Sequence, residues 1–300
     1  MTLSTSRLAE LLYPGIAEIF GHKYKEAEPF YKKIFDVKTS DKSFEKQQGI
    51  TSLPTAAIKE QGDELSFTDI FQGYQKEYIH DTYGLGVTIT REMVEDDQYN
   101  IIKAIPSMAA RSMIHQEEIV HTNVLNNAFS STFTGPDGSA LCVTNHALVA
   151  GGTGQNTPTV AADLTQTSLE NAIIDIMDFR DDQSKRLNIM PKRLVIPRSL
   201  YFTATKILET KYATGSNNND VNVLANMKLD LICTNFLTDQ DAWFLINDTD
   251  LGGLTSYTRR ETEIDKFSDD RTQNLNIVIT RRFATGVPAD WRSVYGSPGA

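Results

Sequence analysis

The sequence has few cysteines, no long apolar run and no surplus of basic residues. Its two cysteines, Cys142 and Cys233, lie far apart and form no CxxC pair, so we interpret them as small buried hydrophobic residues of a reducing compartment. The longest apolar runs, such as 242–246 and 277–279, are far too short to span a bilayer. The first residues do not resemble a signal peptide. These absences predict a protein without a membrane segment that is made and assembled in a cytoplasm.

The charge balance argues against tight binding of nucleic acid. The chain has 29 Lys and Arg against 39 Asp and Glu, which gives a formal net charge of -10 at pH 7. A protein that grips phosphates presents a surplus of Lys and Arg and releases counterions. An acidic wall can still enclose DNA without adhering to it. With 300 residues, 40% of them hydrophobic, the chain is long enough to bury a sizeable core and is not disordered.

Two N-terminal stretches have too little apolar surface to form a core of their own. Residues 1–45 carry a short apolar pattern that is broken by Pro14 and Gly15 and is followed by a lysine-rich tract of mixed charge. This pattern is typical of an arm that lies on another part of an assembly. Residues 48–69 are polar and rich in turn formers, which predicts an extended hairpin, and residues 78–90 predict one longer strand.

The rest of the chain alternates between helical and strand-like patterns. Residues 106–128 predict a helix that starts at Pro106, because proline is tolerated in a first helical turn. At ~1.5 Å per residue this helix would be ~34 Å long, which is long for a globular core. Helical patterns at 168–186 and 197–208 then alternate with short apolar stretches, which predicts an α+β region with one sheet. The strands that we expect there are 193–196, 229–233, 243–246 and 276–280.

The sequence contains no recognisable arrangement of catalytic, metal-binding or cofactor-binding residues. His115 and His121 lie six residues apart on the expected helix, whereas a helical zinc pair needs histidines at i and i+4. The segment 248–259 superficially resembles a calcium loop, but its twelfth residue is Arg259, where a carboxylate is required. The glycine-rich stretches match neither a P-loop nor a dinucleotide fingerprint nor a GxSxG elbow. We therefore predict no catalytic, metal-binding or cofactor-binding residues, and no cofactor.

Three stretches follow one another in a distinctive order. Residues 83–97 (YGLGVTITREMVEDD) lead from a strand into the long helix, and residues 135–148 place a DG turn before a short apolar strand and a histidine. The third stretch comprises the apolar segments at 194–200, 231–234 and 243–248. This succession, over about residues 72–280, resembles the HK97-like major capsid proteins of tailed bacteriophages, especially the branch of the Mu-like major head subunit. Cys142 stands where an aromatic residue is expected in that family.

The resemblance implies an α+β, HK97-like capsid fold in five parts. These are an N-terminal arm at 1–45, an extended β-hairpin loop at 46–82, a peripheral domain with a long spine helix at 83–162, an axial domain at 163–265, and a return to the peripheral domain at 266–300. It also implies the function of a major capsid protein without an active site. Copies of the chain would assemble into hexamers and pentamers and form an icosahedral head shell around the phage genome.

The implied partners are other copies of the chain, a portal, and a scaffold, a protease or decoration proteins during assembly. The DNA would be enclosed without sequence-specific binding, and no membrane would be involved. The resemblance places the protein in the capsid of the virion, after assembly in the host cytoplasm. Two alternatives stay open from the sequence: a soluble α+β enzyme with an unrecognised site, and another phage structural protein such as a tail-tube or portal component.

The resemblance also leads to three narrower expectations. We expect residues 46–75 to pack mainly on adjacent subunits, because this polar hairpin has little apolar surface of its own. Some members of the family cross-link a lysine of this loop to a neighbour, and Lys59 beside Glu60 is the candidate, but we expect no cross-link here. Because an apolar pattern begins soon after Met1, we expect no removal of an N-terminal scaffolding segment.

Overall fold

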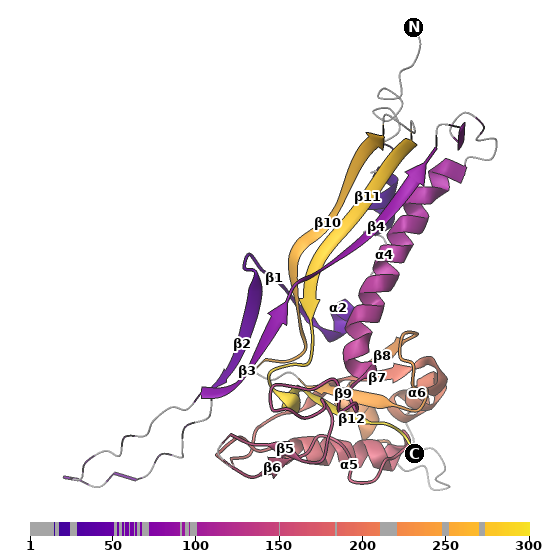
Figure 1. Cartoon of the computed structure of the whole chain (residues 1–300). Helices are drawn as coiled ribbons and strands as arrows, with labels where there is room; N and C mark the ends of the chain where they lie inside the picture. The colour runs from indigo at the N-terminus through magenta and orange to yellow at the C-terminus, as the bar shows by residue number, and fades with distance from the viewer. Residues whose placement is uncertain are drawn as a thin grey trace.

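The fold is described from a computed structural model of the 300-residue chain. It describes residues 18–24, 29–50, 72–90, 101–149, 151–183, 185–210, 221–247, 252–269 and 274–300, together with isolated positions between 15 and 96. This part of the chain forms an elongated body, in which a long helix runs beside a long sheet and leads to a compact domain at one end (Figure 1). Within these ranges no helix combines the length and the hydropathy that a membrane span requires.

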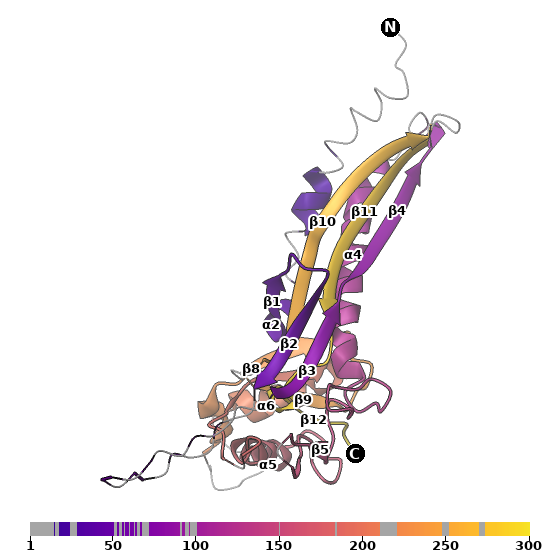
Figure 2. The same cartoon turned by 60° about the vertical axis from the view of Figure 1, so that its left-hand side comes forward.

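A four-stranded sheet forms the long part of the body, with the strand order β1-β10-β11-β4. Its strands are β1 (Asp36–Thr39), β4 (Asp81–Ile89), β10 (Thr255–Asp269) and β11 (Asn274–Thr285). Every second side chain of β11 is buried, among them Ile277, Ile279 and Phe283, as expected for a sheet with one covered face. The cover is helix α4 (Ile101–Asn126), which runs along the sheet in every view (Figure 1 and Figure 2).

Helix α4 is longer than the sequence predicted and does not start at Pro106. It has 26 residues, which corresponds to a length of ~39 Å, and it contains Pro106 inside its second turn. A proline there removes one hydrogen bond of the helix. Its ring is buried, however, and lies in the same apolar cluster of side chains as Val87, Ile105 and Ile277. Packing against the sheet therefore stabilises a continuous helix where the local signal favoured a new start.

The compact domain is built on a second sheet, with the strand order β12-β9-β7-β8. Its strands are β7 (Pro191–Pro197), β8 (Asp230–Thr234), β9 (Trp243–Asn247) and β12 (Val294–Ser297), and its helices are α5 (Gln166–Met177) and α6 (Tyr201–Glu209). Both helices pack on the sheet face that carries Leu194 and Leu245. Helix α5 begins at a capping box, in which Thr165 and Ser168 bond each other's backbone N–H groups. It ends at Met177, well before the expected residue 186.

The other face of the compact sheet packs on the C-terminal end of α4. Val195 of β7 and Phe244 of β9 share one buried cluster with Val124 and Leu125 of the helix. Tyr31, from the short helix α2 (Tyr31–Ile34) of the N-terminal region, belongs to the same cluster. The helix is therefore the common support of both sheets and of the segment before β1.

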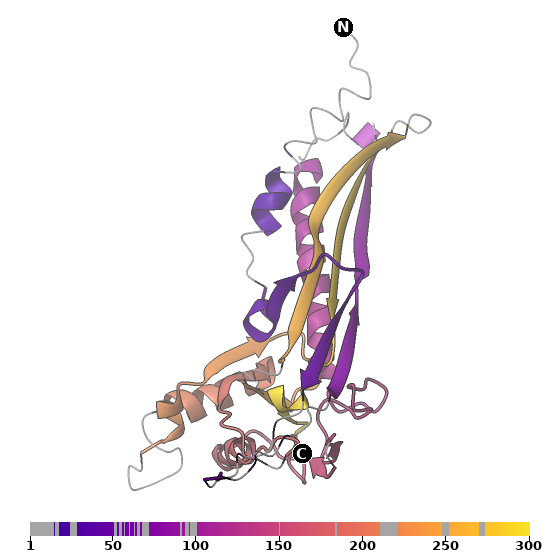
Figure 3. The ribbon, with the colours of Figure 1, turned by 90° about the vertical axis from the view of Figure 1, so that its left-hand side faces the viewer.

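A two-stranded hairpin leaves this body to one side (Figure 1), and that side faces the viewer in Figure 3. Strand β2 (Phe44–Ile50) pairs antiparallel with β3 (Gln72–Ile79), so the paired strands flank the segment 48–69 in which the sequence predicted a hairpin. Most of the residues between the two strands lie outside the described part of the chain. The single strand expected at 78–90 is wrong: β3 and β4 belong to different sheets, and His80 alone separates them.

The strand pairing crosses the expected boundary at residue 265. Strand β10 is one continuous element whose residues on both sides of that boundary pair with β11 in the long sheet. After β11 the chain does not stay with the long sheet, because β12 pairs with β9 at an edge of the compact sheet. The two parts of the body are therefore each built from segments far apart in the sequence.

The packing around β12 generates a first prediction. A Cβ atom at Gly296 would lie 2.7 Å from Phe244 and 2.9 Å from Cys142, whereas one at Gly86 would meet no atom within 4 Å. We expect Gly296→Ala to lower the free energy of unfolding by about 1–3 kcal/mol, because the core has no room for a methyl group. Gly86→Ala is the matched control, and urea titration of both variants is the measurement. Equal stability of the two would contradict this packing.

Candidate functional site

The residues that the sequence suggested for chemistry do not come together. His115 is exposed and lies edge-on to Phe236, whereas His121 is buried and stacks on Tyr31 with 3.9 Å between ring centroids. Among the described residues there is no group of three or more His, Cys, Asp or Glu side chains that could hold a metal ion. The calcium-like segment falls partly on 248–251, outside the described residues.

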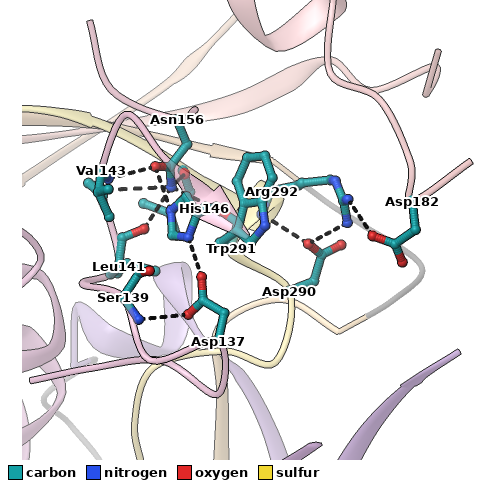
Figure 4. A network of polar contacts seen from close by, with 12 residues as sticks. Asp137, Ser139, Leu141, Val143, His146, Asn156, Asp182, Asp290, Trp291 and Arg292 are labelled. Carbon is teal, nitrogen blue, oxygen red and sulfur yellow. Dashed lines mark hydrogen bonds and ion pairs between the residues drawn. The ribbon is translucent and has the colours of Figure 1, made fainter. Parts of the chain in front are cut away.

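The structure instead brings together a set of polar residues that the sequence did not indicate (Figure 4). His146 is buried; its Nδ1 lies 2.6 Å from Asp137 Oδ2, and its Nε2 lies 3.0 Å from Asn156 Oδ1. The imidazole stacks on the indole of Trp291, with 4.5 Å between the ring centroids. Cys142 lies at the edge of this set, because Asn156 Nδ2 is 3.9 Å from its sulfur.

A cysteine, a histidine and an asparagine can form a catalytic site, but the geometry here does not support catalysis. Burial raises the pKa of the Cys142 thiol far above its usual range, so the sulfur is not a thiolate at neutral pH. Both ring nitrogens of His146 are engaged by Asp137 and Asn156, and neither is bonded to the sulfur. The set is therefore a structural link.

Asn156 connects two distant parts of the chain. Its Oδ1 accepts from the N–H of Val143, and its Nδ2 donates to the carbonyl groups of Leu141, Trp291 and Val294 at 2.7, 3.2 and 2.8 Å. One buried amide thus satisfies backbone groups that would otherwise stay unpaired. It fixes the loop before α5 onto the segment that leads into β12.

Arg292, the residue after Trp291, extends this link (Figure 4). Its side chain is almost fully buried and pairs with Asp290 at 3.2 Å and with Asp182 at 3.3 Å. Its Nε also donates to the carbonyl of Arg180 at 2.8 Å. Burial raises the pKa of Asp290, while the guanidinium beside it acts in the opposite direction. These contacts hold the turn after α5 against the C-terminal segment.

A second buried network attaches the N-terminal segment to α4 and the long sheet. Glu117 of α4 and Arg281 of β11 form an ion pair at 2.6 Å. The hydroxyl of Tyr24 donates to Glu117 and accepts from Arg281, and the hydroxyl of Tyr31 lies 3.3 Å from each partner. Breaking a buried pair by removing one partner leaves an uncompensated charge. The positions of Tyr24 and Tyr31 against α4 and β11 are therefore strongly determined.

Two ionisable groups of the same region have shifted pKa values. Burial lowers the pKa of His121 to about 4, so its ring is neutral at pH 7 and bridges the Glu117 carbonyl and the Ser256 hydroxyl. Burial raises the pKa of Glu118 to about 6, although its carboxylate accepts from the N–H of Phe30. Both groups sit where the N-terminal segment meets α4.

Large apolar side chains are exposed on the projecting parts of the molecule. On the hairpin, Ile79 is 67% exposed, and the described tip positions Ile58 and Phe67 are each 96% exposed. Lys59 is exposed beside Ile58. On the compact domain, Phe202 at the start of α6 is 74% exposed. Exposed apolar residues on projecting elements indicate surfaces that other molecules cover.

The Asn156 link generates a second prediction. Asn156→Ala removes the partners of three carbonyl groups and of the Val143 N–H, so we expect a loss of about 3–5 kcal/mol in the free energy of unfolding. Asn171→Ala, on the exposed side of α5, is the control and should change it by less than about 0.5 kcal/mol. Denaturant unfolding followed by circular dichroism measures both. Similar midpoints for the two variants would show that Asn156 does not connect these segments.

Glu118 generates a third prediction, on pH. Its pKa rises from 4.5 to about 6 on folding, so the folded state binds the proton more tightly than the unfolded state. Stability from this group is therefore present below pH 4.5 and is lost as the pH rises through 6, by about 2 kcal/mol in total. We therefore expect the free energy of unfolding of Glu118→Gln, measured relative to that of the unmodified chain, to increase by about 2 kcal/mol between pH 4 and pH 7.

The measurement is urea unfolding of both proteins at several pH values. Glu77→Gln, which removes an exposed carboxylate of β3, shows the general effect of losing a surface charge. The raised pKa of Glu118 would be contradicted if the free energies of unfolding of Glu118→Gln and of the unmodified chain differed by the same amount at every pH.

Comparison with known proteins agrees with this picture of a structural subunit. The family model described as phage capsid protein matches residues 73–297, which is most of the chain. A comparison with curated proteins finds no match. The match begins in β3 and ends in β12, so it includes α4, the compact sheet and every strand of the long sheet except β1.

Solved structures of shell proteins share the fold at low sequence identity. The virus-like particle from Pyrococcus furiosus is similar with a TM-score of 0.58 and 9% identity, over 95% of this chain and 99% of that one. A Mycobacterium phage Adephagia structure gives 0.57 and 10%, over 91% of each chain. The SrpI encapsulin complex from Synechococcus elongatus gives 0.55 and 8%, over 91% and 88%. The chain therefore belongs to the phage capsid protein family, and it is a structural, non-enzymatic shell protein with the α+β, HK97-like fold.

Proposed function

We propose that this chain is the major capsid protein of a tailed phage, and that it forms the hexamers and pentamers of an icosahedral head shell around the genome. The observation that carries the proposal is a contrast between two parts of the molecule. One is the frame, by which we mean α4 and the two four-stranded sheets, and the other is the set of elements that project from it. The frame has fully buried side chains and polar networks, whereas the hairpin and the start of α6 in the compact domain expose large apolar residues. Neighbouring copies are the molecules that can cover these residues on every subunit of a closed shell.

The hairpin supports this proposal most directly. Among the strands that the structure describes, β2 and β3 pair only with each other, so beyond its root the hairpin is a two-stranded ribbon. An isolated ribbon of this kind is marginally stable in water and gains stability when a further surface packs on it. Adjacent subunits would supply that surface to residues 46–75, while the frame keeps the ribbon at a defined place.

The five-part division is part of the same proposal, with one change that follows from the strand pairing. The arm and the extended loop keep the bounds 1–45 and 46–82, and residues 83–162 remain the part of the peripheral domain that contains the spine helix. The axial domain would contain residues 163–254 together with the segment from about 286 to 300, since β12 completes its sheet. The peripheral part would include β10 and β11, which pair beside α4.

The partners proposed for the shell are further copies of the chain, a portal, and a scaffold, a protease or decoration proteins. The net charge of -10 suits a wall that holds DNA at high density without adhering to it. Assembly would take place in the host cytoplasm, and the finished protein would be part of the virion. Archaeal virus-like particles and encapsulins share the fold, so DNA protected from nuclease inside purified particles distinguishes a phage head from a compartment with other contents.

Deletion of the hairpin tests the proposed assembly. Removing residues 49–69 and joining the ends with a short turn should leave a folded subunit that forms no closed shells, because the exposed apolar residues that neighbours would cover are gone. The double variant Ile58→Ser and Phe67→Ser keeps the ribbon and removes only its apolar tip; it should assemble more weakly. Negative-stain microscopy and light scattering measure assembly, and circular dichroism measures folding. Normal particles from the deletion variant would refute a role of the hairpin between subunits.

A further inference from the structure

His80 occupies a special place at the root of the hairpin. It is the only residue between β3, which pairs with β2, and β4, which pairs with β11 in the long sheet. The angle between the hairpin and the long sheet is therefore set at this residue, which we call the elbow. On the hairpin side, Tyr78 anchors the root: it packs on Tyr257, and its hydroxyl donates to Gln47 at 2.8 Å.

The imidazole of His80 is buried without any polar partner in the part of the chain that the structure describes. The residue is 4% exposed, and neither Nδ1 nor Nε2 has a hydrogen-bond partner there. The other two buried histidines differ, because both ring nitrogens of His121 and of His146 are paired. A buried polar ring without partners costs free energy relative to a hydrated one. Within the described residues, the imidazole ring of His80 is thus held by packing and not by hydrogen bonds.

Charged groups surround His80 from every neighbouring strand. Arg282 of β11 donates from Nε to the carbonyl of His80 itself, at 3.4 Å, and the charge of Arg259 of β10 also acts on the ring. Glu45 of β2 and Asp81 of β4 act in the opposite direction. Burial comes first among the causes that lower the pKa of His80, and the two arginines follow.

Glu45, one of the two acidic groups that act on His80, already has other partners. Glu45 accepts from the Ser40 hydroxyl at 2.8 Å and from Lys42 at 3.2 Å. Arg259 donates to the Ser40 carbonyl at 3.2 Å, which holds it beside the same loop. A proton added to the buried ring would therefore place a positive charge in the field of two guanidinium groups, and the Glu45 carboxylate is already engaged.

We propose that His80 gives the hairpin two positions: a neutral ring keeps the elbow in the described position, and a protonated ring leaves its site and changes the angle between hairpin and long sheet. The buried position binds the proton more weakly than an exposed one, so its stability is present above pH ~6.5 and is lost as the pH falls below that value. The biological role of this pH dependence rests on the proposed function, because the hairpin is the part that would bind to neighbouring subunits.

Spin-label distances on the unassembled full-length chain test the inference without requiring shells. The labels are placed at Gln75→Cys on β3 and Asp265→Cys on β10, both exposed, with Cys233→Ser to remove the accessible native thiol. We expect one distance at pH 8 and a second, additional one at pH 5.5. His80→Phe and His80→Leu should each give one distance at both pH values, and Arg282→Gln should lower the share of the second distance at pH 5.5, because it removes one of the charges that repel a protonated ring. His22→Gln, at an exposed histidine, should behave like the unmodified chain.

Three results would overturn the inference: a single distance in the unmodified chain at both pH values, a second distance that persists in the His80 variants, or its loss in His22→Gln. Circular dichroism of each variant at both pH values separates elbow movement from general unfolding. The proposed shell function fails independently, since it depends on particle formation and not on these distances.

Discussion

The fold depends on one helix that has to cover two sheets. The N-terminal half of α4 packs on the long sheet through residues such as Ala109 and Met113, and its C-terminal end packs on the compact sheet through Val124 and Leu125. A helix of 26 residues is long enough to reach both, and it fixes the distance between them. Apolar packing of both sheets on one continuous helix therefore makes an elongated subunit rigid, although neither sheet is large enough to wrap around the other.

Buried polar contacts complete the frame where apolar packing alone would leave the segments free to shift. The Glu117–Arg281 pair joins the helix, the long sheet and the segment that contains Tyr24. The Asn156 amide joins the loop before α5 to the C-terminal strand. Such contacts demand one geometry, because any displacement leaves a buried group unpaired. The frame can therefore hold the hairpin and the compact domain at fixed places, while their exposed apolar residues remain available for other subunits.

Much of the compact domain could be predicted from the sequence, because its elements carry strong local periodicity. Leu169, Ala172 and Ile173 mark one face of α5, and the apolar strand around Leu194 is evident from composition alone. The extent of β10 was not predictable, since its outer half is exposed and charged and its pairing with β11 is decided by tertiary contact. The polar networks were also missed. Asn156 and Val294 lie 138 residues apart, and no local pattern indicates that they meet.

The account claims that the frame is complete within one subunit and that neighbouring copies complete the hairpin. Hydrogen exchange of the unassembled chain and of purified particles tests this claim most directly. The account predicts that amides of α4 between residues 110 and 126 are equally protected in both states, because their packing is internal. Amides of β2 and β3 should gain at least about tenfold in protection on assembly, which corresponds to about 1.4 kcal/mol. Equal exchange of the hairpin in both states, or protection of α4 that arises only in particles, would contradict it.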